Sequence, residues 1–163
     1  MTRIYAKHCN NGPRLSCRLI VIIAALNFTN GCSINPIAAR QEDGLRLTHQ
    51  IEKLLGSPYR FGGNNPSGFD CSGLMQYTHQ ELGINIPRTT VEQLKHSRRV
   101  NFSNIRPGDL IFFHLNQTKA SHVGMYIGKM QMIHAPSTSK HVSFANLKNN
   151  YWRSRIIAVG RYY

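Results

Sequence analysis

Two stretches in the first half of the chain carry apolar residues at helical spacing. In residues 42–55 the apolar positions share one helical face, and a glycine and a proline follow soon after. The second stretch runs from Cys71 to Leu82, where apolar or weakly polar residues recur three, four, seven and eleven positions after the first. Asp70 and Gly83 stand where the N-cap and the C-cap of this second helix belong. The pattern therefore predicts two helices, the second of which begins at Cys71.

The second half of the chain changes to short apolar runs separated by turn residues, and these predict β-strands. The strands are expected at residues 110–114, 121–127, 130–135, 141–144 and 156–161. Before them, a capping box at Thr89–Glu92 predicts a short helix to about His96. Because helices precede strands without β–α alternation, the sequence indicates an α+β fold, in which helices pack on an antiparallel sheet.

The strand at residues 121–127 has two different faces. Alternation places three apolar residues, beginning with Val123, on the core side, and puts His122 and Gly124 on the other. Gly124 has no side chain, so another group can approach His122 there. His134 ends the following apolar strand, and it can orient His122 only if both side chains point to the same face.

The turn between these two strands decides which face His134 occupies. A two-residue turn at Gly128–Lys129 with regular pairing would put Val123 opposite His134, and the two histidines would then point to opposite faces. His134 can therefore orient His122 only with a loop of odd length, or with a bulge that shifts the register by one residue. Gly128 can supply the positive φ that such a connection often uses.

The N-terminal residues have the pattern of a targeting segment. Basic residues precede a short apolar run, Leu19–Leu26, which is too short to span a bilayer and suits the h-region of a signal peptide. A glycine then precedes Cys32, which resembles the bacterial lipoprotein signal. The sequence predicts a signal peptide over residues 1–31, acylation of Cys32 and a linker over residues 32–41.

The expected location follows from that resemblance. Ser33 after the cysteine implies a lipid anchor in the outer membrane, on its periplasmic face. Without acylation, we expect a soluble periplasmic or secreted protein.

The length of 163 residues fits a single domain, and the net charge of +13 favours an anionic partner. Such a partner could be a nucleic acid, a membrane or an acidic polymer such as the cell wall. The basic residues are scattered and no nucleic-acid-binding motif is present, which argues against nucleic acid. We expect a monomer.

The cysteines draw attention to Cys71. Of the four cysteines, Cys9 and Cys17 would leave with the signal peptide, and an acylated Cys32 would have no thiol. A lone free thiol in an oxidising compartment is a liability unless it is used. The start of a helix also favours a thiolate, which a nucleophilic cysteine requires. A small buried cysteine at the start of a core helix is the structural alternative.

A nucleophilic thiol needs a neighbouring imidazole, and that imidazole needs a polar partner to fix its tautomer. Cys71, His122 and His134 could supply these three parts. The remaining histidines are expected to be surface or structural residues: His8, His49, His79, His96, His114 and His141. A zinc site built from the same three residues is an alternative, although scattered ligands without a close pair are a weak metal signature.

Several motifs together resemble the NlpC-type cell-wall peptidases, which are bacterial papain-like cysteine peptidases. The motifs are Tyr59–Gly63, Asp70–Gly73, Arg106–Leu110, His122–Gly124 and Ile133–Ala135. The resemblance runs from about residue 47 to the end of the chain, which implies a peptidase domain over residues 42–163. It also implies a papain-like arrangement, with the nucleophile helix packed on a C-terminal antiparallel sheet.

The resemblance further implies roles for individual residues. Cys71 would be the nucleophile, His122 the base and His134 the group that orients it. The Tyr59 hydroxyl would help the backbone N–H of Cys71 to hold the oxyanion. Two further residues, Asp70 and Ser72, would line the substrate site, and Asp70 could receive a substrate ammonium group.

The implied activity is hydrolysis of peptidoglycan stem peptides, without a metal or an organic cofactor. The bond would be D-γ-glutamyl–diaminopimelate or the diaminopimelate–D-alanine cross-link. An amidase or acyltransferase that uses the same thiol, and a catalytically silent wall-binding module, are the alternatives. The order of cysteine before histidine argues against the permuted acyltransferases.

Overall fold

The computed structural model describes residues 36–115 and 120–163, and for residues 36–40 the backbone alone. The predicted signal peptide and Cys32 lie outside the described residues. Within the described ranges, no helix has both the length and the apolar character needed to cross a membrane.

The helices begin where their capping residues predict, with one exception. The four helices of the described part are α2 (Pro36–Glu52), α3 (Cys71–Gln80), α4 (Thr90–His96) and α5 (Asn150–Arg153). In α3 the N-cap Asp70 accepts a hydrogen bond from Gly73 N, and Gly83 just beyond the helix has a φ of 75°. In α4 the Thr89 side chain accepts from Glu92 N, as predicted.

The exception is α2, which begins at Pro36 and not at the predicted Glu42. Residues 36–41 are therefore helical, and the helix extends into the segment predicted as a linker. Proline is favoured in the first turn of a helix because that turn leaves its N–H groups unpaired. The four-residue helix α5 was not predicted.

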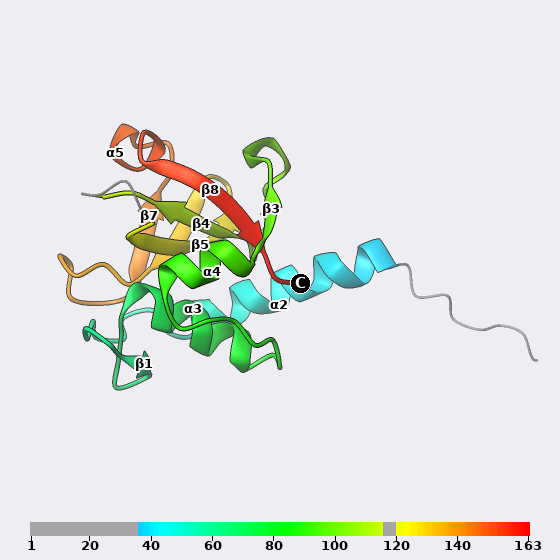
Figure 1. The fold of residues 1–163 in the computed structure, drawn as a ribbon. Coiled ribbons are helices and arrows are strands. Elements are labelled where there is room, and N and C mark those ends of the chain that lie inside the picture. Colours follow the sequence, from blue (N-terminus) through cyan, green and yellow to red (C-terminus); the bar gives the residue numbers. More distant parts are fainter. Residues whose placement is uncertain (1–35, 116–119) are drawn as a thin grey trace, which may run out of the picture. The chain divides into compact units, whose positions relative to one another are not determined.

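The strands form one six-stranded antiparallel sheet in the order β3-β8-β4-β5-β6-β7 (Figure 1). They are β3 (Arg98–Val100), β4 (Leu110–Phe113), β5 (His122–Gly128), β6 (Gln131–His134), β7 (Ser143–Asn146) and β8 (Ile156–Arg161). A separate small hairpin pairs β1 (Asn64–Asn65) with β2 (Gly68–Phe69), and a 3₁₀ turn, η1, covers Phe102–Asn104. The α+β prediction is confirmed, although β7 lies two residues later than expected and β3 was missed.

A bulge sets the register between β5 and β6. Tyr126 pairs with Met132, but Gly128 pairs with Gln131, so Ile127 has no partner on β6. The turn itself consists of Lys129 and Met130, with φ values of 49° and 58°. The simple turn at Gly128–Lys129 is therefore not formed. The one-residue shift confirms the bulge that the shared face of the two histidines requires.

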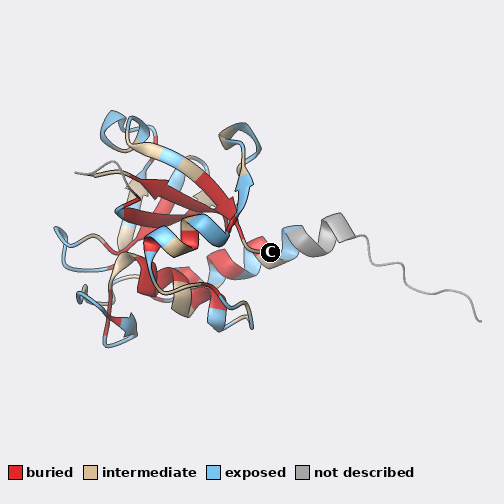
Figure 2. Cartoon of the chain, in the orientation of Figure 1, coloured by how far each residue is buried: buried red, intermediate tan, exposed pale blue. Residues whose placement is uncertain are grey.

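The sheet is covered on both faces. Val123 and Met125 belong to the larger core, which the sheet forms with α2 and α3. Figure 2 shows the buried parts of the sheet and of these two helices in red. A smaller cluster covers the other face and contains Ile111, Phe113, Tyr126, Met132 and Leu147, with Trp152 packed against it. His122 and His134 are only 5% and 3% exposed, and both contact Trp152. The histidine face of β5 is therefore buried beneath α5.

The Arg106–Leu110 motif is structural. Asp109 is fully buried, accepts from Arg106 N at 2.8 Å, and pairs with Arg161, whose Nη2 lies 2.6 Å from Oδ2. The Tyr163 hydroxyl donates to Pro107 O at 2.6 Å. These bonds fasten the start of β4 to the end of β8, its neighbour in the sheet.

Candidate active site

Cys71 is the first residue of α3, and its position depends on close backbone packing. A methyl group at Gly73 would collide with the carbonyl oxygen of Gly63, so the glycine at position 73 allows the loop before the helix to lie directly on its first turn. The Cys71 thiol lies 3.8 Å from the Thr90 hydroxyl of α4. It is also within hydrogen-bonding reach of the backbone N–H of Val123, which places it beside the start of β5.

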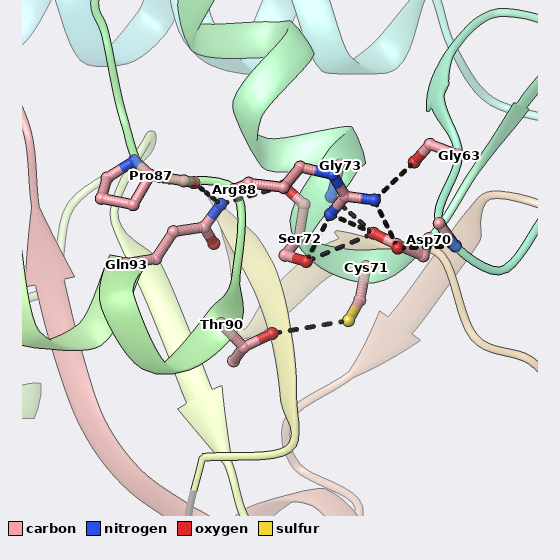
Figure 3. A network of polar contacts seen from close by, with 10 residues as sticks. Gly63, Asp70, Cys71, Ser72, Gly73, Pro87, Arg88, Thr90 and Gln93 are labelled. Carbon is pink, nitrogen blue, oxygen red and sulfur yellow. Dashed lines mark hydrogen bonds and ion pairs between the residues drawn. The ribbon is translucent and has the colours of Figure 1, made fainter.

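Asp70 holds this arrangement together through five hydrogen bonds (Figure 3). Arg88 makes a bidentate contact, with Nη1 2.9 Å from Oδ1 and Nη2 2.6 Å from Oδ2. The backbone N–H groups of Gly62 and Gly73 donate at 3.0 and 2.7 Å, and the Ser72 hydroxyl donates at 3.2 Å. Such charge-assisted, paired bonds are among the strongest that a protein forms.

This network changes the expected roles of Asp70 and Ser72. Both oxygens of the Asp70 carboxylate already accept from Arg88, and the Ser72 hydroxyl accepts from the same guanidinium at 2.9 Å. Asp70 is therefore not an open acceptor, and a substrate ammonium group would compete with Arg88 for it. Burial raises the pKa of Asp70, but the bonds from Arg88 and Gly73 outweigh burial and bring the pKa below its usual value.

Gln93 ties the Arg88 segment to the nucleophile helix. Its fully buried side chain donates to Ser72 O at 2.9 Å and to Pro87 O at 2.8 Å. Its backbone carbonyl accepts from the Tyr162 hydroxyl at 2.6 Å. The start of α3, the loop before α4 and the end of the chain are thus joined at one residue.

The two predicted histidines are hydrogen-bonded to each other. His122 Nε2 and His134 Nδ1 are 2.8 Å apart, and the rings meet nearly at right angles, at 81°. The absence of a side chain at Gly124 makes this possible, because a Cβ there would lie 3.3 Å from the Cβ of His134. The prediction that Gly124 leaves room for a second group beside His122 is confirmed, and that group is His134.

Aromatic side chains enclose the imidazole pair. The Trp152 ring is stacked on His122, with centroids 5.7 Å apart, and lies edge-on to His134 at 4.9 Å. Phe113 of β4 lies 6.0 Å from His122, measured between ring centroids. His122 Nδ1 forms no hydrogen bond to a described residue and is the nitrogen left for a reaction partner.

The environment favours neutral side chains. Burial lowers the pKa of His122 to about 3, helped by repulsion from His134, and burial lowers the pKa of His134 to about 4. Burial also raises the pKa of the Cys71 thiol, as does the Asp70 carboxylate, although bonds from Thr90 and Val123 oppose them. The pKa of the thiol is thus shifted in the opposite direction to the one expected from the helix start, because burial disfavours the charged form.

Tyr59 lies close to the nucleophile, as expected. Burial raises the pKa of its hydroxyl, and the nearby Cys71 and Asp70 raise it further. The phenol is therefore a hydrogen-bond donor at neutral pH, which suits a group that would stabilise an oxyanion.

Four residues of the site were not identified from the sequence: Arg88, Thr90, Gln93 and Trp152. Three of them lie at or next to the capping box at Thr89. That pattern predicts the start of a short helix but not a contact with the nucleophile helix. Trp152 is the only tryptophan in the chain, and a large aromatic residue among basic residues was a signal that could have been followed.

Comparison with known proteins agrees with this geometry. The NlpC/P60 family matches residues 56–161. Gamma-DL-glutamyl hydrolase of Bacillus subtilis is 41% identical over 119 residues, covering 71% of this chain and 29% of that protein. Murein DD-endopeptidase MepS/Murein LD-carboxypeptidase of Escherichia coli is 41% identical over 111 residues, covering 68% of this chain and 58% of that protein.

Solved structures are similar as well. An NlpC/P60 family protein from Bacillus cereus is 33% identical with a TM-score of 0.69, covering 73% of this chain and 40% of that one. The NlpC/p60 domain of peptidoglycan hydrolase SagA is 30% identical with a TM-score of 0.63, covering 72% of this chain and 97% of that domain. This chain spans less than two thirds of the curated relatives named here, but most of the SagA domain. With the match over residues 56–161, the chain belongs to the NlpC/P60 family.

Proposed function

We propose that this chain is a thiol endopeptidase that cleaves amide bonds in the stem peptides of peptidoglycan. The observation that carries the proposal is a cysteine at the start of a helix, beside a strand whose histidine is hydrogen-bonded to a second imidazole. The names of its relatives, a glutamyl hydrolase and a murein endopeptidase, support the substrate class.

The first half of the reaction forms a thioester. His122 Nδ1 takes the thiol proton of Cys71 while the sulfur attacks the amide carbon, and the carbonyl electrons move to oxygen. Because Nδ1 must be the free base, the ring hydrogen of His122 is on Nε2, which donates a hydrogen bond to His134. The Tyr59 hydroxyl and the Cys71 backbone N–H donate to the oxyanion.

The second half releases both products. The oxyanion collapses, the carbon–nitrogen bond breaks, and the leaving amine takes the proton from His122. A water molecule then attacks the thioester carbon and loses a proton to His122. The second oxyanion collapses, the carbon–sulfur bond breaks, and the product leaves with a new carboxylic acid. The same proton returns to the sulfur, so no external oxidant, reductant or metal is consumed.

Two bonds fit the proposal. D-γ-glutamyl–diaminopimelate lies within one stem, and diaminopimelate–D-alanine joins two stems. Both kinds of name occur among the relatives: the Bacillus subtilis protein described above is named a gamma-DL-glutamyl hydrolase, and the Escherichia coli protein a DD-endopeptidase. Both bonds therefore enter the test.

Digestion of purified cross-linked and uncross-linked wall fragments, followed by mass spectrometry of the products, tests the function. The matched control is Cys71→Ser, which replaces sulfur by oxygen in the same position. We expect stem-peptide fragments from the wild type only. Cleavage by Cys71→Ser would rule out the nucleophile, and release of whole stem peptides from the glycan would identify an amidase instead. Wall binding without any cleavage would identify a binding module.

Alkylation gives an independent test of the nucleophile. Because burial raises the pKa of the Cys71 thiol, iodoacetamide should react slowly at neutral pH and faster in alkaline buffer. Activity should fall in step with the alkylated fraction.

We also propose that Cys32 is acylated and anchors the enzyme to the periplasmic face of the outer membrane. The proposal is supported by the apolar run at residues 19–26 and the Gly31–Cys32–Ser33 sequence. Among its structural relatives is a Staphylococcus aureus protein described as similar to lipoprotein, 31% identical, with a TM-score of 0.68, covering 74% of this chain and 41% of that one. We expect the wild-type protein in the membrane fraction with the added mass of a lipid. The Cys32→Ala variant should lack both the lipid mass and the membrane association. A fully soluble wild type would contradict it.

A further inference from the structure

Trp152 occupies an unusual position for a tryptophan on a short surface helix. Its indole is nearly parallel to the His122 ring, at 30°, and nearly perpendicular to the His134 ring, at 89°. Phe113 of β4 lies edge-on to the same indole, with centroids 5.2 Å apart. The indole therefore contacts both imidazoles and covers them on the face of the sheet opposite α3.

The helix that carries Trp152 is fastened on both sides. The Asn149 side chain caps α5 by accepting from Tyr151 N at 2.8 Å. Arg155 donates to Tyr151 O at 2.8 Å, and its guanidinium lies 4.1 Å above the Tyr151 ring. Tyr151 in turn lies edge-on to Trp152 at 5.1 Å. These contacts lie within residues 149–155 and stiffen the segment that carries the indole.

We propose that Trp152 is a positioning residue of the active site, whose indole excludes water from the His122–His134 hydrogen bond and fixes the plane of the His122 ring. The proposal rests on the proposed function for its kinetic consequences, but its physical basis can be measured without substrate. This role would explain why a helix that is otherwise exposed carries a large aromatic side chain.

The consequence is a base that stays neutral in acid. Removing water from an imidazole disfavours its charged form, which agrees with the lowered pKa values of both histidines. Other titratable or charged groups on the surrounding elements are Asp70 and Cys71 at the start of α3, His114 after β4, and Arg153 and Arg155 at α5. Asp70 is already paired with Arg88, so it does not counterbalance an imidazolium.

Fluorescence tests the proposal directly, because Trp152 is the only tryptophan among the 163 residues. A protonated imidazole in contact with an indole quenches its emission by accepting an electron, whereas a neutral imidazole quenches weakly. We expect constant emission from about pH 8 down to about pH 5, although a free histidine titrates near 6.5. Quenching with a midpoint near 6.5 would overturn the proposal.

The measurement is made in a His114→Gln background, because the backbone N–H of His114 donates to Arg155 O at 3.1 Å and this histidine therefore lies near the end of α5. Far-ultraviolet circular dichroism at each pH separates quenching from acid unfolding. In a further His122→Asn, His134→Asn variant, any remaining quenching must come from elsewhere.

Enzyme kinetics test the same proposal in two variants. Trp152→Ala opens the pair to water, so the pKa of the base should rise towards its ordinary value of about 6.5. Relative to about pH 8, kcat/KM at about pH 5.5 should then fall about tenfold more in Trp152→Ala than in wild type, since only about a tenth of the base stays neutral. Trp152→Phe keeps an apolar ring and should preserve the wild-type acid limb.

The control is Phe144→Ala, which removes an exposed aromatic ring on β7 and should leave the pH profile unchanged. An equal loss at both pH values in Trp152→Ala would mean that the indole is only a structural filler. Wild type without wall cleavage at any pH would defeat the proposed function, while the fluorescence titration would still decide the role of Trp152.

Discussion

The two sides of the active site are built on opposite physical principles. On the nucleophile side, Asp70 is ionised, paired with Arg88 and supplied with backbone N–H donors. On the base side, His122 and His134 have one hydrogen bond between them and aromatic rings around them. Charge fixes the backbone that carries the sulfur, whereas exclusion of water keeps the imidazoles neutral.

Because of this difference, the nucleophile side should contribute mainly to stability and the base side mainly to catalysis. The Asp70 network joins the loop at Gly62, the first turn of α3 and the segment at Arg88, so breaking it should loosen the fold. The imidazole pair contributes one buried hydrogen bond between side chains, and altering it should change the chemistry more than the folding.

Asp70→Ala should have the largest effect, because it removes the N-cap of α3 and leaves Arg88 without its partner. We expect a loss of about 2 to 3 kcal/mol in the free energy of unfolding, together with loss of hydrolysis. Urea denaturation at neutral pH measures it. Asp43→Ala is the matched control, since its pair with Arg46 is exposed, at 42% and 57%, and should contribute less than about 0.5 kcal/mol.

The same variant gives a pH signature. The folded-state pKa of Asp70 is below its unfolded value, so its contribution is complete above about pH 4 and is lost as the pH falls through the folded-state pKa. The stability difference between wild type and Asp70→Ala should therefore shrink in acid. A difference that is constant down to about pH 2 would show that the ionised carboxylate is not the cause.

His134→Phe should come next, with a fall of about a hundredfold in kcat and little change in the melting temperature. Phenylalanine fills the space but cannot hydrogen-bond His122 Nε2. His134→Asn retains a polar partner and should recover part of the rate. If both variants unfold at much lower temperature than wild type, His134 is a structural residue and the contrast between the two sides fails.

Gly124→Ala should have a smaller effect. The new methyl group would lie 2.8 Å from the sulfur of Met132 and 3.3 Å from the Cβ of His134. The flexible methionine can move, but His134 must shift by a few tenths of an ångström. We expect about a tenfold lower kcat and about 1 kcal/mol lower stability. An unchanged kcat would mean that the spacing of the two rings is not critical.

A chelator should have no effect on hydrolysis, because the thiol and the imidazole need no Lewis acid. Activity is measured after dialysis against EDTA and again after addition of zinc. Inhibition that zinc reverses would favour the alternative of a metal site at Cys71, His122 and His134.

Local rules predicted much of this structure. Capping residues located the starts of α3 and α4, and the period-two pattern of β5 predicted which side chains share a face. Counting alone predicted either a loop of odd length or a bulge between β5 and β6, because the two histidines can share a face only in these two ways. The structure forms the bulge, at Ile127. These features depend on residues that are near each other in the sequence.

The features that were missed depend on contacts between distant segments. Arg88 is hydrogen-bonded to Asp70, which lies 18 residues earlier in the chain. Trp152 of α5 contacts His122 of β5, although two strands lie between them in the sequence. The pKa of Cys71 depends on how much water the surrounding loops exclude, and helix position alone predicted the wrong direction. A substrate role for Asp70 was inferred without knowing that Arg88 already fills its hydrogen-bonding capacity.

The unpaired Ile127 makes the hairpin tolerant of one change in length, at the bulge itself. Replacing Ile127 by another residue leaves the count unchanged, and both histidines stay on one face. Deleting this one residue would remove the bulge, but Tyr126 would still pair with Met132 and Gly124 would still lie opposite His134, so both histidines would again stay on one face. Deleting one residue of the regular ladder, such as Met125, would instead bring Val123 opposite His134 and turn the two imidazoles to opposite faces. Loss of that single codon should therefore inactivate the enzyme.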